Sequence, residues 1–351
     1  MKRGRKSTGV KEIAEKLNIS PSTVSVVLNG QGRELRISRD TQDRVWSAAE
    51  EYGFCRREGA LPGRAGRVYA SRAVVTIFMP YMTDIKVASR ILYGFQKAIV
   101  EGGLDVKVVM QTFLVGELYR YADEISSHVC DGAIILGMEE SDLSFLREND
   151  FDIPVLLFNR VTEKYSTVYV DDYEVGNKVA RLFKARGHKN VGLVFPVQRG
   201  KSGNMRKLGF LDGCRECGLD MNPLYICEDI LHVNGGKNAV DELIARCERA
   251  GVCLPTAMFV FITEMTVGVM HELALNGIRV PENMEIVSYG DNFMEEQMLP
   301  SVTAVKMEVE EMGKKCLETV MQLIQSGARE PSVSLFPTPL IVRMSCGGFP
   351  E

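Results

Sequence analysis

The sequence has no run of 18 or more apolar residues, which excludes a helix that spans a membrane. It has only four histidines, all dispersed, and its C-x-x-C motif, CREC at 214–217, has no second cysteine pair beside it. A zinc site would need further ligands, so the motif predicts two free thiols. No glycine-rich phosphate loop follows the first apolar strand, and no nucleophile motif appears. We therefore expect a protein that is not an enzyme and that needs no metal or cofactor.

The nine cysteines are odd in number and scattered along the chain. No signal peptide precedes the first helical stretch. Together these features predict a protein of the reducing cytoplasm.

Charge is unevenly divided along the chain. Residues 1–72 carry 15 Lys and Arg against 8 Asp and Glu, whereas the remainder carries 27 basic against 38 acidic residues. A basic N-terminal part on an acidic body indicates a polyanionic partner for the basic part. The run KRGRK at 2–6 adds a basic arm, although such a run by itself is more often a solvated surface.

Residues 9–30, GVKEIAEKLNISPSTVSVVLNG, predict two short helices joined by a tight turn. Apolar residues three or four apart, from Val10 to Leu17, form one face of the first helix. Ser20 is a good N-cap, and Pro21 suits the first helical position, where its missing N–H costs little. The proline therefore begins a second helix instead of breaking one.

The second helix has two unlike faces. Val24, Val27 and Leu28 share the face that we expect to be buried. The other face has small polar groups, one valine and no long charged side chain: Ser22, Ser25, Val26 and Asn29, with Thr23 on the flank. Such a face suits a DNA major groove, where hydroxyls reach phosphates or base edges and a methyl group meets thymine. A helical hairpin within a core is the alternative, and the basic charge favours DNA.

A third helix follows, with Ser38 as its N-cap and Gly53 just beyond its end. Its apolar residues recur on one face: Val45, Ala48, Ala49 and Tyr52. We expect Trp46, the only tryptophan, to lie in the core of this three-helix cluster.

The segments VKEIAEKLNISPSTVSVVLNG and ISRDTQDRVWSAAEEYGF resemble the N-terminal domain of the lactose-repressor/galactose-repressor (LacI) family of bacterial transcription regulators. The shared pattern is S-x-x-TVS-x-V-x-N followed by an amphipathic helix that ends near GF. By position, the resemblance implies base-reading roles for Pro21, Ser22 and Val26, phosphate contacts for Thr23 and Ser25, and the end of the helix at Asn29. Many relatives have a polar or cationic residue where Val26 stands, which leaves the operator sequence open.

Residues 55–72, CRREGALPGRAGRVYASR, form a basic linker rich in Gly and Arg. Relatives usually carry a Pro-Asn pair here, in a stretch that folds into a hinge helix on operator binding. Arg56 and Arg57 replace that pair, and Gly59, Pro62 and Gly63 disfavour a helix. We expect no conventional hinge helix, and we expect the two arginines to contact phosphates or a narrow minor groove.

From residue 73 onward, apolar segments alternate with amphipathic helical stretches. The predicted strands are AVVTIFMP, VKVVM, DGAIILG, PVLLFNR, VGLVFP, TAMFVFI and MEIVSYG. The predicted helices lie near 85–101, 116–128, 141–149, 202–217, 236–250 and 265–276. This alternation predicts parallel sheets with helices on both faces, arranged as two lobes. Ligands in such folds bind at the carboxyl ends of the strands, here facing a cleft.

The same region resembles the family's effector domain, which is related in fold to periplasmic sugar-binding proteins. Shared segments include VDDYEVG at 170–176, RKLGF at 206–210 and VPENMEIVSYGDN at 280–292. The implied fold is an all-α helix-turn-helix headpiece followed by a two-lobed α/β domain like that of periplasmic binding proteins. The implied boundaries are a DNA-binding domain at 1–54, a linker at 55–72 and an effector-binding and dimerisation domain at 73–351. Lobe 1 is expected at about 73–165 and 303–330, and lobe 2 at about 166–302 and 331–351.

The resemblance also implies a set of effector-binding residues. Arg206 matches the arginine of an R-x-x-GF motif that grips the ligand, and Asp291 matches an aspartate at the end of a strand. The other cleft positions are Asn159, Arg160, Asp171 and Phe261, with Tyr81 and Asp84 after the first strand. A structural salt bridge or a solvated loop is the alternative role for each of them.

One departure bears on the ligand. Sugar-responsive relatives typically have Asn-Asp where this chain has Ile262 and Thr263. Buried sugar hydroxyls without partners are costly, so a plain hexose is disfavoured. We expect a flatter or more apolar metabolite, which suits Phe261 and Ile262.

These features predict a sequence-specific, DNA-binding transcriptional regulator, most simply a repressor, whose operator affinity changes when a small metabolite binds. A homodimer would read a pseudo-palindromic operator with one helix per half-site. The chain ends soon after its last strand, without room for a terminal heptad helix, so dimers are expected. The alternative is a cytoplasmic small-molecule binding protein, for a sugar or a nucleobase-like compound, with weak or lost effector response or DNA specificity.

Overall fold

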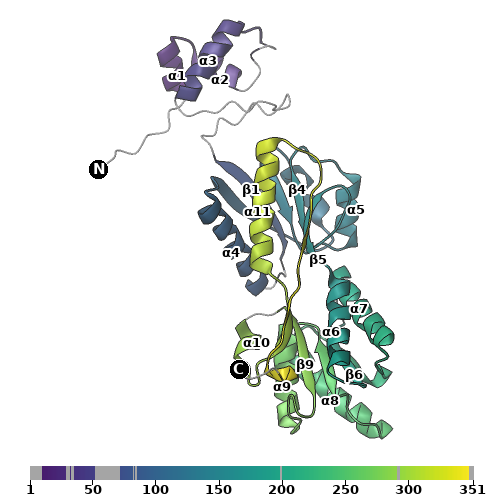
Figure 1. Ribbon diagram of the computed structural model, residues 1–351. Coiled ribbons are helices and arrows are strands. Elements are labelled where there is room, and N and C mark those ends of the chain that lie inside the picture. The colour runs from purple at the N-terminus through teal and green to yellow at the C-terminus, as the bar shows by residue number, and fades with distance from the viewer. Residues whose placement is uncertain are drawn as a thin grey trace, which may run out of the picture. The chain divides into compact units, whose positions relative to one another are not determined.

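A computed structural model describes residues 10–28, 32, 35–51, 72–81, 83, 85–197, 200–290 and 293–347. The N-terminal part has three helices, α1 (Val10–Leu17), α2 (Pro21–Leu28) and α3 (Arg39–Glu51), drawn in purple in Figure 1. The predicted apolar faces meet in one core: Ile13, Ala14, Val24, Val27, Leu28, Val45, Ala48 and Ala49. Trp46 packs against this core, partly buried, as predicted. Tyr52 and Gly53 lie outside the described residues.

Local chemistry explains where α2 and α3 begin. Ser20 Oγ accepts a hydrogen bond from the backbone N–H of Thr23 at 3.0 Å, so Ser20 is the N-cap of α2 and Pro21 is its first residue. Ser38 Oγ accepts from the backbone N–H of Thr41 at 3.2 Å and caps α3 in the same way. Both predicted helix starts are confirmed.

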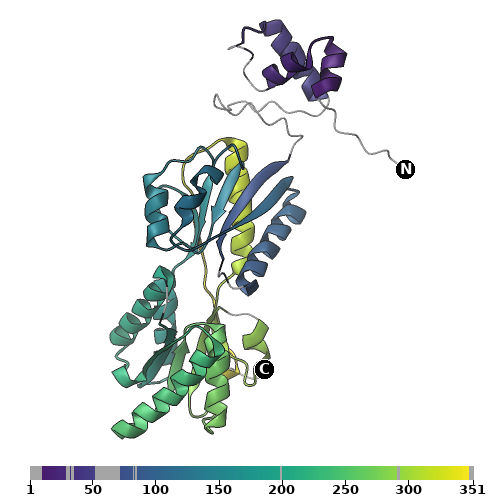
Figure 2. The ribbon, with the colours of Figure 1, turned by 180° about the vertical axis from the view of Figure 1, so that it is seen from behind.

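The chain divides into two compact units. Unit 1 comprises Met1–Thr167 and Gly313–Ser332, and unit 2 comprises Val168–Met312 and Val333–Glu351. The chain therefore passes between the units three times. There are two six-stranded sheets with helices against them, the first mainly in unit 1 and the second in unit 2 (Figures 1 and 2).

The first sheet has the strand order β11-β5-β4-β3-β1-β2. Its strands are β1 (Ala73–Pro80), β2 (Val106–Phe113), β3 (Gly132–Ile135), β4 (Val155–Phe158), β5 (Ser166–Val170) and β11 (Val333–Phe336). The accompanying helices are α4 (Ile85–Gly102), α5 (Glu140–Glu148) and α11 (Val309–Ser326). β1 pairs in parallel with β2 and β3, and β3 with β4. The long buried run of β1 fits its place between two strands.

The second sheet has the order β12-β10-β9-β8-β6-β7. Its strands are β6 (Val191–Pro196), β7 (Ile226–Asp229), β8 (Ala257–Val260), β9 (Glu285–Gly290), β10 (Thr303–Lys306) and β12 (Leu340–Ile341). Its helices are α6 (Asp172–Ala185), α7 (Lys201–Cys217), α8 (Val233–Ala250), α9 (Thr263–Leu275) and α10 (Phe293–Gln297). The pairing is parallel from β7 to β10, and β12 is antiparallel to β10. The predicted architecture of two mainly parallel sheets is confirmed.

Two expectations were wrong in detail. Residues 116–128 do not form an α-helix, because the segment holds only a 3-10 helix, η1 (Leu118–Glu124), with a non-helical residue at Tyr121. β10 was expected in lobe 1, but it pairs with β9, Thr303 opposite Val287, and so belongs to the second sheet. The chain accordingly leaves unit 2 at 312/313 instead of near 303. A four-residue apolar strand has no local signal that says which sheet it will join.

Candidate nucleic-acid interface and ligand site

The surface of α2 matches the predicted division into two faces. Val24, Val27 and Leu28 are buried. On the other side Pro21 and Ser22 are exposed, and Thr23, Ser25 and Val26 are half-buried. Asn29, Arg56 and Arg57 lie outside the described residues. The described part of α2 therefore presents small polar and methyl groups, without a charged side chain, from one short ridge.

Ser20 also organises the hydroxyls at the start of α2. Its Oγ lies 2.8 Å from Ser22 Oγ and 2.8 Å from Thr23 Oγ1. The same oxygen accepts the capping hydrogen bond from the backbone of Thr23. The cap therefore holds two of the predicted DNA-contacting side chains in place, in the manner of a preorganised site.

In unit 2, Arg206 of α7 forms a buried ion pair with Asp172 at the start of α6. Arg206 is 5 % exposed, and its Nη2 and Nε lie 2.7 and 3.2 Å from the same oxygen, Asp172 Oδ1. Its Nη1 donates to the backbone carbonyl of Phe261 at 3.1 Å. The alternative that the sequence left open for Arg206, a structural salt bridge, is thus present in this structure.

Two aromatic rings lie against the Arg206 guanidinium. Its Cζ is 3.3 Å from the ring centroid of Tyr289 and 4.6 Å from that of Phe261. Burial raises the pKa of the Tyr289 phenol, so this ring stays neutral. Phe261 belongs to the apolar core of unit 2, and its ring therefore packs on the arginine instead of standing open as a stacking platform.

A close approach of two helix backbones brings the ion pair together. A Cβ atom at Gly209 of α7 would lie 1.9 Å from the carbonyl oxygen of Tyr173, and one at Gly176 of α6 would lie 2.1 Å from that of Arg206. Only glycine allows the helices to come this near. Asp172 and Arg206 sit beside these crossing points, which explains how residues 34 positions apart share a hydrogen bond.

A second buried polar cluster lies between α9, α10 and β9. Glu295 is fully buried and accepts hydrogen bonds from Thr263 Oγ1 and, at 3.1 Å, from Ser288 Oγ. Thr266 Oγ1 lies 2.9 Å from the Ser288 hydroxyl and 3.0 Å from the carbonyl oxygen of Ile262. Sequence reasoning missed Glu295 and Asp172, since neither stands in a motif that marks it as buried.

The remaining predicted ligand residues have varied surroundings. Asn159 follows β4 in the left-handed region, with φ of 53°, and Arg160 donates to the carbonyls of Met138 and Asn159 at 3.0 and 2.7 Å. Asp171 accepts from the backbone N–H of Glu174 at 3.0 Å and is the N-cap of α6. Tyr81 is exposed. Asp84 and Asp291 lie outside the described residues. The structure therefore brings together Arg206 and Phe261 from the predicted set.

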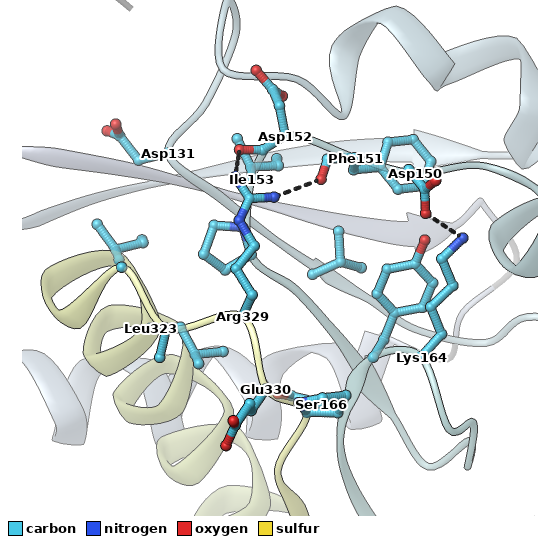
Figure 3. Close-up of a pocket in the computed structure, with 17 residues that line it drawn as sticks. Asp131, Asp150, Phe151, Asp152, Ile153, Lys164, Ser166, Leu323, Arg329 and Glu330 are labelled. Atoms are coloured by element: carbon cyan, nitrogen blue, oxygen red, sulfur yellow. Dashed lines mark hydrogen bonds and ion pairs between the residues drawn. The ribbon is translucent and has the colours of Figure 1, made fainter. Parts of the chain in front are cut away.

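Unit 1 contains a cavity of about 300 Å³ at the amino-terminal ends of β3 and β4 (Figure 3). These are the ends opposite to the carboxyl ends, where the ligand site was predicted. Arg329 reaches across it toward the backbone carbonyls of Phe151 and Asp152, each 3.3 Å away, and Lys164 pairs with Asp150 at 2.8 Å. None of the predicted ligand residues is among those that line it. Ligands of parallel sheets bind at the carboxyl ends of strands, so this cavity is not the predicted site.

Among the described residues, no group of three or more His, Cys, Asp or Glu side chains could hold a metal ion. Cys214 and Cys217 are both free thiols, as predicted, and burial raises the pKa of Cys214 to about 12. No helix in the described part of the chain has the length and apolar character needed to cross a membrane.

Comparison with known proteins agrees with this geometry. Residues 9–56 match the model of bacterial regulatory proteins of the lacI family, and residues 180–346 match that of the periplasmic binding protein-like domain. The sucrose operon repressor of Klebsiella pneumoniae is 22 % identical over 347 residues, covering 96 % of this chain and 98 % of its own. The chain belongs to the LacI family.

Other relatives of this LacI-family chain extend over nearly its whole length. The transcriptional repressor CytR of Escherichia coli is 23 % identical over 346 residues, which is 97 % of each chain. A LacI-family transcription regulator from Clostridium acetobutylicum is 27 % identical, with a TM-score of 0.72, and covers 77 % of this chain and 99 % of its own. The lac repressor dimer bound to operator matches with a TM-score of 0.67 at 20 % identity, over 97 % of this chain and 99 % of its own.

Proposed function

We propose that this LacI-family protein is a transcriptional repressor that binds a pseudo-palindromic operator as a homodimer and responds to a small metabolite. Each subunit would place α2 in one major-groove half-site, with Pro21, Ser22 and Val26 toward the bases and Thr23 and Ser25 toward phosphates. The observation that carries this proposal is the uncharged ridge of α2, exposed at Pro21 and Ser22 and preorganised by Ser20, within a chain of repressor-like architecture.

DNA selection followed by affinity measurement tests the proposal. The full-length protein is used to select operator sequences from fragments of its source genome, and the affinity for the selected site is measured by fluorescence anisotropy. Ser22→Ala and Val26→Ala should each weaken specific binding about tenfold or more, since each removes a base-edge contact. Ser47→Ala, an exposed serine on α3, is the matched control and should not change the affinity. Selection of no common sequence by the folded protein would contradict the proposal.

The metabolite would bind at the carboxyl-end edge of the second sheet, where Arg206 follows β6 and Phe261 follows β8. Asp291 at the end of β9 and Asp171 at the end of β5 are further ligand candidates, and Asn159, Arg160, Tyr81 and Asp84 are the candidates from unit 1. Binding would change DNA affinity only if the ligand distinguishes two states of the protein. Measurement of operator affinity with and without ligand tests this coupling.

Exposed apolar side chains on α4 support the homodimer. Ile85 and Val100 are each 81 % exposed, and Tyr93 is also exposed. Their spacing of eight and seven residues places them on one side of the helix. A second copy of the chain is the occupant that a two-fold operator requires.

A repressor of this kind acts in the bacterial cytoplasm, at the nucleoid where its DNA lies, and needs no enzymatic activity. The second candidate function is a small-molecule binding protein with weak or lost effector response or DNA specificity. The ion pair of Arg206 with Asp172 favours the weak or lost effector response of this candidate, because the predicted ligand-gripping arginine already has a partner. Ligand binding that leaves operator affinity unchanged would support this candidate over the first.

A further inference from the structure

The cavity of unit 1 is lined in part by apolar side chains. Ile153 and the β4 residue Val155 are buried, and Leu323 and Ile324 of α11 are half-buried. Its volume of about 300 Å³ is that of a pocket for a small organic molecule. The cavity lies at the amino-terminal strand ends of unit 1, so it is separate from the predicted effector site.

The charged groups that line this cavity disfavour an anion. The ammonium group of Lys164 has three N–H donors. Its Nζ lies 2.9 Å from the carbonyl oxygen of Arg147, 2.7 Å from that of Asn149 and 2.8 Å from Asp150 Oδ1, so all three are engaged. The carboxylates outnumber the cations among the lining residues: Asp131, Asp150, Asp152 and Glu330 against Lys164 and Arg329. Such a lining attracts positive charge.

The carboxyl end of α11 adds negative potential from the backbone. The helix ends at Ser326, and Leu323, Ile324 and Gly327, in its last turn and just beyond, line the cavity. The last carbonyl groups of a helix carry the negative end of its dipole, which favours a cation nearby. This contribution does not depend on the acidic side chains.

A cation of the chain itself lies in the cavity. The guanidinium of Arg329 reaches the backbone carbonyl oxygens of Phe151 and Asp152 (Figure 3). Both nitrogen–oxygen distances are 3.3 Å, longer than the usual range of about 2.7–3.2 Å, and the side chain of Arg329 is exposed. The two carbonyls therefore accept from a cation, but they hold this one weakly enough for a ligand to replace it.

Two aromatic rings favour an organic cation. Phe151 and Tyr165 both line the cavity, with ring centroids 6.3 Å apart. The face of such a ring attracts a cation, and Lys164 Nζ already lies 5.5 Å from the centroid of Tyr165. Among the described residues, no group of acidic, His or Cys side chains could hold a metal ion. Aromatic and apolar walls suit a cation that carries a hydrocarbon chain.

We propose that this cavity binds a small organic cation, a primary amine or guanidine with a short apolar chain, whose charged group replaces Arg329 at the carbonyls of Phe151 and Asp152. The chain of the ligand would pack against Ile153 and Leu323. This site goes beyond the proposed function, because none of the residues predicted to bind the effector lines it.

Calorimetry on the full-length protein tests the ligand class. Cadaverine, 1,5-pentanediol and glutarate have carbon chains of equal length that end in ammonium, hydroxyl and carboxylate groups, and agmatine adds a guanidinium. We expect cadaverine and agmatine to bind at least about tenfold more tightly than the diol or glutarate, because hydrogen bonds from a charged donor are stronger. Binding of the diol or glutarate as tightly as cadaverine, or no binding of either cation, would overturn the proposal.

Removal of Arg329 locates the binding group. Arg329→Ala takes away the competing cation and leaves both carbonyls open, so cadaverine should bind about fivefold more tightly or better. Arg120→Ala is the control, because Arg120 pairs with Glu117 outside the lining and its loss should change the affinity less than about twofold. An arginine that only stabilised the fold would not weaken amine binding by its presence. Arg329→Gln serves if Arg329→Ala is unfolded by circular dichroism.

Removal of a lining carboxylate should have the opposite effect. Glu330→Gln should weaken cadaverine binding about threefold, since Glu330 is an exposed carboxylate of the lining. Asp123→Asn removes an exposed carboxylate of unit 1 that does not line the cavity, and it should leave the affinity unchanged. Unchanged amine affinity in both Arg329→Ala and Glu330→Gln would place the amine elsewhere and refute the assignment.

Operator binding is measured separately, so the two proposals can fail independently. Selection of an operator by a protein that binds neither cation would leave the repressor intact and refute this site. Amine binding that responds to Arg329→Ala, in a protein that selects no operator, would support this site and refute the repressor.

Discussion

At the residue scale, Arg206 is both a predicted effector-binding residue and one member of a buried ion pair. Its partner Asp172 and the Tyr289 ring stand in segments shared with the family but were not predicted as its partners, and both come from other elements. Two charges removed from water need each other, because an uncompensated buried charge is costly. The pair therefore keeps the arginine fixed in one orientation before any ligand arrives.

Asp172→Asn should destabilise unit 2 by about 3 kcal/mol or more, because it leaves the Arg206 charge buried without its counter-ion. Urea denaturation of the full-length protein, followed by circular dichroism, measures the change. Glu242→Gln is the control, since it breaks a partly exposed pair with Arg246 on α8 and should cost less than about 1 kcal/mol. Similar losses of unfolding free energy in the two variants would show that the buried pair contributes no more to stability than the partly exposed one.

The surroundings of Glu285 lead us to expect that the fold loses stability in acid. Burial alone would raise its pKa, but hydrogen bonds from His188 and Arg186, and the charges of both, outweigh burial and lower the pKa to about 2. A carboxyl group with a lowered pKa stabilises the fold above its unfolded pKa of 4.5 and loses that contribution as the pH falls toward 2. The loss should be about 3 kcal/mol across this window. Denaturation series from pH 5 to pH 2 should show that the free energy of unfolding depends less on pH in Glu285→Gln than in the wild type. An equal pH dependence in the two proteins would contradict the prediction.

At the scale of elements, the site depends on how closely α6 and α7 cross. The crossing relies on Gly176 and Gly209, where backbone of one helix meets the other. Neither helix could approach so near with larger residues, and the Asp172–Arg206 pair would then separate. Helix packing in unit 2 thus decides whether Arg206 and Asp172 can form their ion pair.

Gly209→Ala should cost about 3 kcal/mol or more, because its methyl group would meet the Tyr173 carbonyl at 1.9 Å. It should also weaken any Arg206-dependent ligand binding. Gly102→Ala, at the end of α4, is the control, because its nearest neighbour would be Leu104 at 3.5 Å, an ordinary contact. That change should lie within about 1 kcal/mol of wild type. Thermal unfolding of both variants measures these changes. If Gly209→Ala were as stable as Gly102→Ala, the prediction would be wrong.

For the whole molecule, the proposed operator reading needs two copies of the chain. In that proposal a single α2 would read only one half-site, and the basic N-terminal part would add affinity without sequence preference. The exposed apolar side of α4 is the described surface on which we place part of the dimer contact. Loss of this dimer contact should therefore weaken DNA binding without altering α2.

Val100→Glu should shift the protein toward monomers, since it puts a charge on the apolar side of α4. Sedimentation velocity at several concentrations measures the change, and operator affinity should fall at the same time. Leu275→Glu, at the exposed end of α9, introduces the same charge elsewhere and should leave the dimer intact. A dimer that tolerates Val100→Glu as well as Leu275→Glu would place the contact on another surface.

Local chemistry in the sequence determined the helix starts at Ser20 and Ser38, the two faces of α2, the partition of charge and the alternation of strands and helices. These features depend on neighbours within a turn or two, so reading along the chain finds them. The tertiary structure alone decided the partners of Arg206, the burial of Glu295 and the sheet that β10 joins. Asp172 lies 34 positions from Arg206 and Thr263 lies 32 from Glu295, so only the packing of separate elements brings them together. What Arg206 can offer a ligand depends on which of its N–H groups those distant partners use.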